Sequence, residues 1–142
     1  MSDNLTYDVW LPISNRADDE GLGSLTEREQ TLHLCFDFVC QIDNGGLSGY
    51  GYNVDAPYRA ALVSALRRIN ALKTAALMER ADAILNSPVS PASANTWEKF
   101  LTIADPENEL DRLDQSLGEQ IDAERVREQT DEIAAAISSG KD

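Results

Sequence analysis

The stretch PYRAALVSALRRINALKTAALMERADAILN, residues 57–86, carries the clearest structural signal in the chain. Apolar side chains recur in it every three or four residues, the spacing of one face of an α-helix. Pro57 suits the first turn of a helix because its φ is fixed near the helical value. The pattern predicts one helix of about 30 residues whose apolar stripe is made of Leu62, Leu66, Ile69, Leu72, Ala76, Leu77 and Ile84.

The segment before this helix predicts another one. Ser24-Leu-Thr-Glu27 fits a capping box, in which a hydroxyl and a carboxylate satisfy each other's unpaired backbone N–H groups. Helical spacing of apolar residues then predicts a helix over about 25–43. Asp43-Asn44-Gly45-Gly46 predicts its end, because Asn and Gly accept left-handed backbone angles at little cost. Residues 1–23 are predicted to form an irregular or short-helical arm.

The segment after residue 86 begins with a Ser- and Pro-rich linker. Asn95 or Thr96 can cap a short helix that ends near Ile103. Asp105-Pro106-Glu107 predicts the start of a further helix, and Gly118 can interrupt that helix. The final stretch, to Ile137, is predicted to be helical as well. The thin apolar stripe after Ile121 fits either a homodimer seam or a marginal tail.

No segment alternates like a half-buried strand. We therefore expect an all-α fold, a single-domain bundle of about five or six helices packed around a long central helix. The expected organisation is one domain over residues 1–142, with an arm at 1–23, a helical core at 24–138 and a tail at 139–142.

Charge is the strongest compositional signal, since 25 acids face 12 bases and the net charge is -13. Such a chain repels nucleic acid and anionic membranes and attracts basic surfaces. The acids concentrate in residues 91–142, which hold thirteen acids and five bases, whereas residues 61–90 hold two and four. This predicts an acidic partner-binding face, although simple solubility also explains acidity. Its candidate residues are Asp105, Glu107, Glu109, Asp111, Asp114, Glu119, Asp122, Glu124, Glu128, Asp131 and Glu132.

The sequence offers little for cofactor or metal chemistry. His33 is its one imidazole, so neither a zinc site nor a catalytic pair with Cys35 or Cys40 is expected. The glycine-rich residues 45–51 lack the lysine and Ser/Thr of a phosphate-binding loop. We expect no catalytic residue, metal or cofactor, and a small enzyme using this loop remains a minor alternative. With no apolar run of about 20 residues and no signal peptide, a cytoplasmic protein without a membrane anchor is expected.

The run Ile42-Asp-Asn-Gly-Gly-Leu-Ser-Gly-Tyr-Gly-Tyr-Asn53 resembles the core motif of the bacterial DNA-mimic protein domain family. Residues 65–71, Ala-Leu-Arg-Arg-Ile-Asn-Ala, and Leu113-Asp114 resemble two further elements of it, so the resemblance covers about residues 25–120. Leu47, Gly49 and Asn70 depart from the pattern, as does Ser116-Leu117. The motif residues, which form a structural turn or line a pocket, are Asn44, Gly45, Gly46, Tyr50 and Asn53.

The resemblance implies an all-α fold and an acidic decoy for a DNA-binding protein. The leading hypothesis is therefore a protein-interaction module whose carboxylates imitate DNA phosphates and occupy a basic, DNA-binding partner. The alternative is an immunity or antitoxin-like protein that neutralises a basic effector. Both hypotheses exclude direct nucleic-acid binding, and both leave the partner unidentified.

Overall fold

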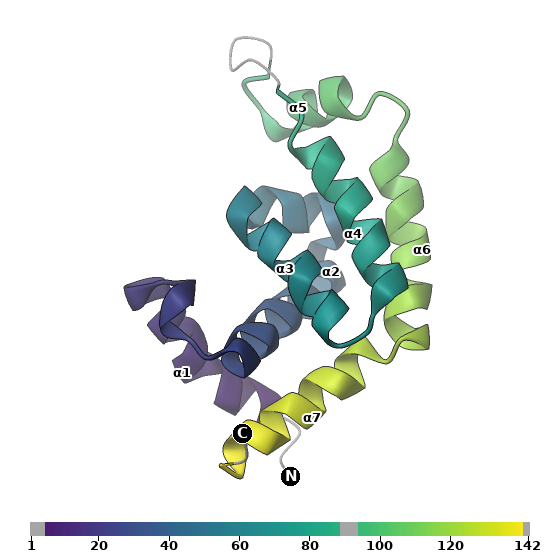
Figure 1. The fold of residues 1–142 in the computed structure, drawn as a ribbon. Coiled ribbons are helices and arrows are strands. Elements are labelled where there is room, and N and C mark those ends of the chain that lie inside the picture. Colours follow the sequence, from purple (N-terminus) through teal and green to yellow (C-terminus); the bar gives the residue numbers. More distant parts are fainter. Residues whose placement is uncertain (1–4, 89–93, 141–142) are drawn as a thin grey trace.

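The computed structural model describes residues 5–88 and 94–140. These residues form seven α-helices, one short 3₁₀ helix (Leu22–Ser24) and no strand (Figure 1). The all-α prediction is therefore confirmed, with seven helices in place of five or six. The α-helices are α1 (Leu5–Glu20), α2 (Glu27–Asn53), α3 (Ala56–Arg68), α4 (Leu72–Leu85), α5 (Trp97–Ala104), α6 (Glu109–Ala123) and α7 (Val126–Ser138).

The predicted helix over 57–86 was wrong, because the chain turns between α3 and α4. Asn70 takes a left-handed conformation with φ 62°. Its N–H donates to the carbonyl of Arg67, and the Ala71 N–H donates to that of Leu66 at 2.8 Å. This is the hydrogen-bond pattern of a Schellman helix stop, with Asn in the position that usually holds glycine. The two halves of the apolar stripe pack against each other as neighbouring helices.

Helix α2, rather than the 57–86 segment, contacts most of the other helices. It contacts α1, α3, α4, α6 and α7. Its N-cap is Thr26, whose hydroxyl accepts from the Glu29 N–H while the Glu29 carboxylate accepts from the Thr26 N–H. The capping box therefore lies two residues after the predicted Ser24 and Glu27. At Gly46, with φ 63° and ψ -163°, the helix breaks as predicted, and a helical segment continues to Asn53.

The other departures lie at the ends of the chain. The predicted arm contains the 16-residue helix α1, which tolerates Pro12 because buried Ile13 and Ala17 hold it against α2 and α7. Helix α6 begins at Glu109, beyond the predicted start at Asp105-Pro106, and it runs through Gly118 without a break. The chain instead turns at Arg125, which has φ 55°.

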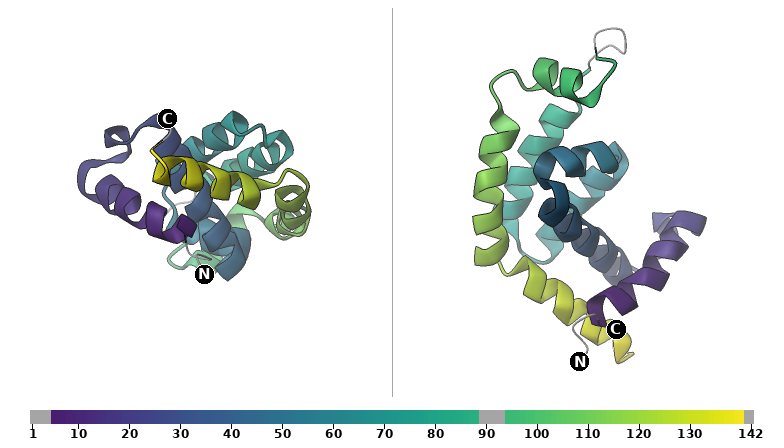
Figure 2. Two further views of the ribbon diagram at one scale, coloured as in Figure 1. Left: turned by 90° about the horizontal axis from the view of Figure 1, so that it is seen from below. Right: turned by 180° about the vertical axis from the view of Figure 1, so that it is seen from behind.

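Two apolar clusters hold these helices together. The larger one joins α2, α3, α4 and α6 and includes the fully buried Phe38, Leu66, Met78 and Leu117. The smaller one lies under α1 and joins it to α2 and α7. In two opposite views α6 and α7 follow each other along one edge of the molecule (Figures 1 and 2). Within the described residues, no helix is both long and apolar enough to cross a bilayer.

Candidate partner-binding surface

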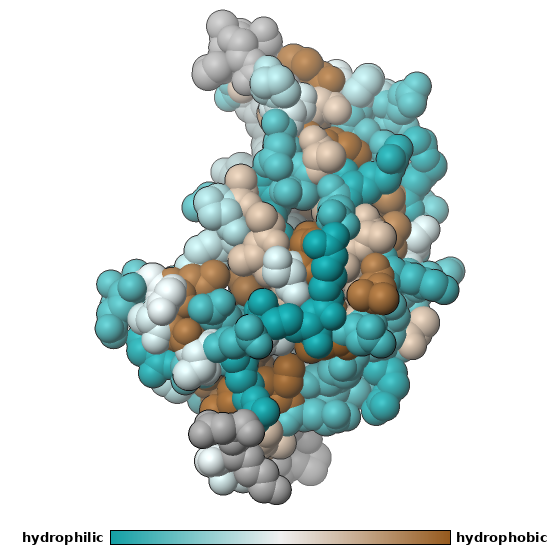
Figure 3. Space-filling model, in the orientation of Figure 1, coloured by the Kyte–Doolittle hydropathy of each residue, from teal (hydrophilic) through white to brown (hydrophobic). Residues whose placement is uncertain are grey.

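Helix α6 turns one face into the core and the opposite face outward. Its buried residues are Leu110, Leu113, Leu117 and Ile121, a stripe with steps of three and four residues. At 100° per residue, this stripe places Glu119 and Asp122 on the outward half of the helix and Asp111 on its flank. All three are exposed. The face seen in Figure 3 is mainly hydrophilic along this edge, with apolar side chains in small separate patches.

Asp105 has a structural function that its sequence position only partly suggested. It is buried, and its two carboxylate oxygens accept from the backbone N–H groups of Glu109 and Leu110 at 2.8 and 2.9 Å. These are among the N–H groups that have no partner inside the first turn of a helix. Asp105 therefore caps α6 from outside the helix, and its carboxylate is not available to a partner protein.

Glu124 caps a different helix. Its carboxylate follows α6 and accepts from the Lys73 N–H at 3.0 Å and from the N–H and hydroxyl of Thr74, both at 2.7 Å. These donors belong to the first turn of α4, which has no side-chain cap of its own. Burial raises the pKa of Glu124, but the hydrogen bonds from Lys73 and Thr74 outweigh it and lower the pKa below its ordinary value.

Replacing Glu124 by glutamine is expected to destabilise the protein by about 1 kcal/mol, the usual contribution of a helix cap. Because the folded-state pKa of Glu124 is lowered, its stabilisation is complete above the unfolded-state pKa. It is then lost as the pH falls through the folded-state value. Urea denaturation between pH 7 and pH 3 should therefore show a weaker acid dependence in E124Q. In contrast, E119Q, which changes an exposed carboxylate on α6, should retain the wild-type profile.

Asp114 contacts the glycine turn of α2. Its Oδ1 accepts from the Leu47 N–H at 3.2 Å, at the start of the helical segment that follows the break at Gly46. A Cβ at Gly46 would lie 2.6 Å from Oδ2 of Asp114. The Leu-Asp element and the Asn-Gly-Gly element therefore meet in space, although 67 residues separate Leu47 from Asp114. This contact joins α2 to α6.

The other motif residues lie around the same turn. Asn44 and Gly45 are exposed, and no atom lies within 4 Å of the Cβ that Gly45 lacks. Tyr50 is buried edge-to-face against Phe38, with ring centroids 5.7 Å apart. Asn53 donates from its side-chain amide to Oε1 of Gln41 at 3.1 Å. Tyr50 and Asn53 thus connect the two segments of α2.

Three further candidate acids also bind within the protein. Glu109 forms an ion pair with Arg80. Asp131 accepts from the Thr6 hydroxyl at 2.6 Å, and Glu132 lies 3.8 Å from Arg125. With Asp105, Asp114 and Glu124, six of the eleven candidate carboxylates have partners in the structure. The sequence did not distinguish them because their partners come from distant segments.

Five candidate acids remain unengaged. They are exposed, and within residues 5–88 and 94–140 their carboxylates form no hydrogen bond or ion pair; they are Glu107, Asp111, Glu119, Asp122 and Glu128. We call them the outer acids. Asp111 and Asp122 are eleven residues apart in α6, which is about 16 Å along the helix axis.

The arginines of the same segment bind elsewhere. Arg112 donates to the backbone carbonyl of Glu107 at 2.8 Å. Arg127 makes two hydrogen bonds to Asp43 on α2, at 2.7 and 2.9 Å. These bonds raise the pKa of Arg127, and burial, which lowers it, does not cancel the rise. Arg125 lies near Glu132. These three arginines therefore form no ion pair with the exposed carboxylates of the outer acids, although the charge of Asp122 contributes to the raised pKa of Arg127.

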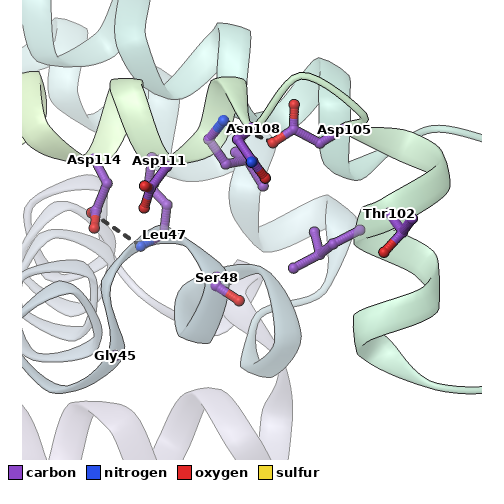
Figure 4. A pocket seen from close by; sticks show the side chains of 10 residues that line it. Gly45, Leu47, Ser48, Thr102, Asp105, Asn108, Asp111 and Asp114 are labelled. Carbon is purple, nitrogen blue, oxygen red and sulfur yellow. Dashed lines mark hydrogen bonds between the residues drawn. The ribbon is translucent and has the colours of Figure 1, made fainter.

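Sequence reasoning missed a cavity beside this row of acids. It lies between the Gly45–Ser48 part of α2, the end of α5 and the first turns of α6, and its volume is about 430 Å³ (Figure 4). Ser48, Thr102 and Asn108 line it together with Asp111 and Asp114. These residues come from three separate segments, so no local pattern could have revealed the cavity.

The fold and the surface define an all-helical protein with an outward row of carboxylates along one edge. The chain belongs to the DMP19-like protein family, whose model matches residues 23–138. This match confirms the resemblance to the DNA-mimic family and extends it from α2 to α7, whereas α1 lies outside it. Neither the curated proteins nor the solved structures include a significant match.

Proposed function

We propose that this protein is a non-catalytic interaction module, a DNA mimic that occupies the basic DNA-binding surface of a partner protein. The observation that carries the proposal is the row of outer acids, whose carboxylates form no ion pair within the described residues. The family described as DMP19-like supports it, as does the net charge of -13.

The geometry of the row fits a short stretch of DNA backbone. Its span on α6, about 16 Å, is close to half of a B-DNA helical turn, which measures about 34 Å. The Cβ atoms of residues three or four apart on one helix face lie about 5–6 Å from each other, and the phosphates of one DNA strand advance about 3.4 Å each along the axis. The row is thus sparser than DNA, so it can satisfy only some of the cations of a DNA-binding surface.

The proposal is tested by capture from a bacterial lysate at low salt, followed by identification of the bound proteins. We expect DNA-binding proteins that double-stranded DNA displaces from the acidic protein. The quadruple variant D111N/E119Q/D122N/E128Q should bind them about thirtyfold more weakly, because each exposed charge pair contributes about 0.5 kcal/mol. The measurement is the dissociation constant of the captured protein at several salt concentrations.

The matched control is D8N/D19N/E20Q/E27Q, which removes the same number of negative charges from exposed positions on α1 and the start of α2. If the acids act only through the overall charge, the two variants should lose affinity equally. We expect the control to lose less than about threefold. The proposed function would be contradicted if DNA did not displace the captured proteins, or if the captured proteins did not bind DNA.

A further inference from the structure

The cavity between α2, α5 and α6 is lined by both apolar and acidic residues (Figure 4). Leu47, Leu101 and Leu110 supply the apolar surface, and Asp111 and Asp114 supply the carboxylates. In Figure 4 both Asp side chains point from α6 toward the α2 segment that contains Leu47 and Ser48. No lysine or arginine lies among the described residues that line the cavity.

The negative charge of the cavity is only partly used by the protein itself. Asp105 directs both oxygens to backbone N–H groups of α6, and Asp114 directs Oδ1 to the Leu47 N–H. Asp111 has no partner in the described part of the chain, and Oδ2 of Asp114 accepts no hydrogen bond there. Because residues three apart on a helix are neighbours, the Cβ atoms of Asp111 and Asp114 lie about 5–6 Å from each other.

We propose that this cavity receives an arginine side chain from the DNA-binding partner, so the inference rests on the proposed function and specifies one of its contacts. An arginine has an apolar stem that packs on leucines and a planar cation that binds carboxylate oxygens through several N–H groups. Asp111 and Asp114 offer such oxygens in the same cavity that the three leucines line. Proteins that bind DNA phosphates use arginines in the same way, because phosphate oxygens also accept several N–H groups of one guanidinium.

Arginine fits this site better than lysine. The guanidinium group is flat, more weakly hydrated than an ammonium and able to reach two carboxylates at once. The ammonium group of lysine is a compact, strongly hydrated charge. Exposed acids elsewhere on α6 attract both cations about equally, since they act mainly through long-range charge. A preference for arginine is therefore the signature that separates the cavity from the rest of the acidic row.

The experiment compares two peptides of equal charge, tetra-arginine amide and tetralysine amide, by calorimetry at low salt. The protein should bind the arginine peptide about tenfold more tightly, the effect of one additional charge-assisted hydrogen-bond pair. D111N should abolish this preference, whereas E119Q, which removes an equal charge from the same helix outside the cavity, should keep it. Both variants should melt like the wild type because both side chains are exposed.

Three results would each overturn the cavity assignment. They are an equal loss of the arginine preference in D111N and E119Q, an arginine preference that survives in D111N, and no peptide binding at all. A second copy of this chain is the other source of arginine, and sedimentation would reveal it if D111N converted a dimer into a monomer. That result too would overturn the proposal that the arginine comes from a DNA-binding partner. The capture of proteins that DNA displaces tests the proposed function separately. A negative result with the peptides would therefore contradict the cavity assignment and not the proposed function.

Discussion

Replacing Gly46 by alanine is expected to destabilise the protein by about 3 kcal/mol or more. At φ 63° and ψ -163° the backbone of Gly46 occupies a region that is almost closed to residues with a Cβ. That conformation alone imposes a penalty of about 1–3 kcal/mol on alanine. The added Cβ would also lie 2.6 Å from Oδ2 of Asp114, so the contact between α2 and α6 has to open. Urea denaturation measures the loss.

Gly45→Ala is the matched control for this prediction. Gly45 has no positive φ, and nothing lies within 4 Å of the Cβ it lacks. Alanine is the better helix former, so G45A should be neutral or stabilising by up to about 1 kcal/mol. If G46A and G45A gave equal free energies of unfolding, the break at Gly46 would not be a fixed feature of the fold.

A double-mutant cycle separates the two causes. Asp114→Ala removes the carboxylate that the new Cβ would meet and also the acceptor for the Leu47 N–H. In the D114A background, G46A should retain its backbone penalty and lose its steric one. The two substitutions should therefore be non-additive, with a coupling of about 1 kcal/mol. Full additivity would mean that Asp114 moves away without difficulty.

The break at Gly46 was predictable from the sequence, but the helical segment after it was not. Asn-Gly-Gly supplies residues that adopt a left-handed conformation easily. Four glycines in residues 45–51 then argue against a helix by propensity. The segment is helical because Leu47 and Tyr50 are buried in the core, and because a bare backbone at Gly51 lets Leu85 approach. Tertiary packing thus overrode a local preference.

The turn between α3 and α4 shows a different limit. Helical periodicity continues through Asn70 because the apolar faces of both helices meet the same core. The usable signal was chemical: Asn70 departs from the pattern of the resembled family, and asparagine, like glycine, accepts a left-handed φ. The candidate acids show a third limit. Composition located the acidic segment, but the caps made by Asp105 and Glu124 depend on tertiary contacts.

Replacing Arg59 by methionine is expected to destabilise the protein by about 3–5 kcal/mol, the usual effect of breaking a buried ion pair. Arg59 is only 8% exposed and donates in three directions. Nε binds Oδ1 of Asp82 at 2.7 Å, and the two terminal nitrogens bind the Val54 carbonyl and the Asn86 side-chain oxygen, each at 2.6 Å. Methionine would fill much of the space and satisfy none of these acceptors.

The size of the effect follows from what Arg59 leaves behind. Val54 is the C-cap of α2, so its carbonyl has no partner within that helix, and Asp82 would keep an unpaired charge. R67M is the control, because the exposed pair of Arg67 with Glu79 should contribute less than about 1 kcal/mol. R59M/D82L should be more stable than R59M alone, since it removes the stranded carboxylate as well. If R59M and R67M had equal free energies of unfolding, water would be replacing the guanidinium group. Arg59 would then not be needed to hold the ends of α2 and α4 against the start of α3.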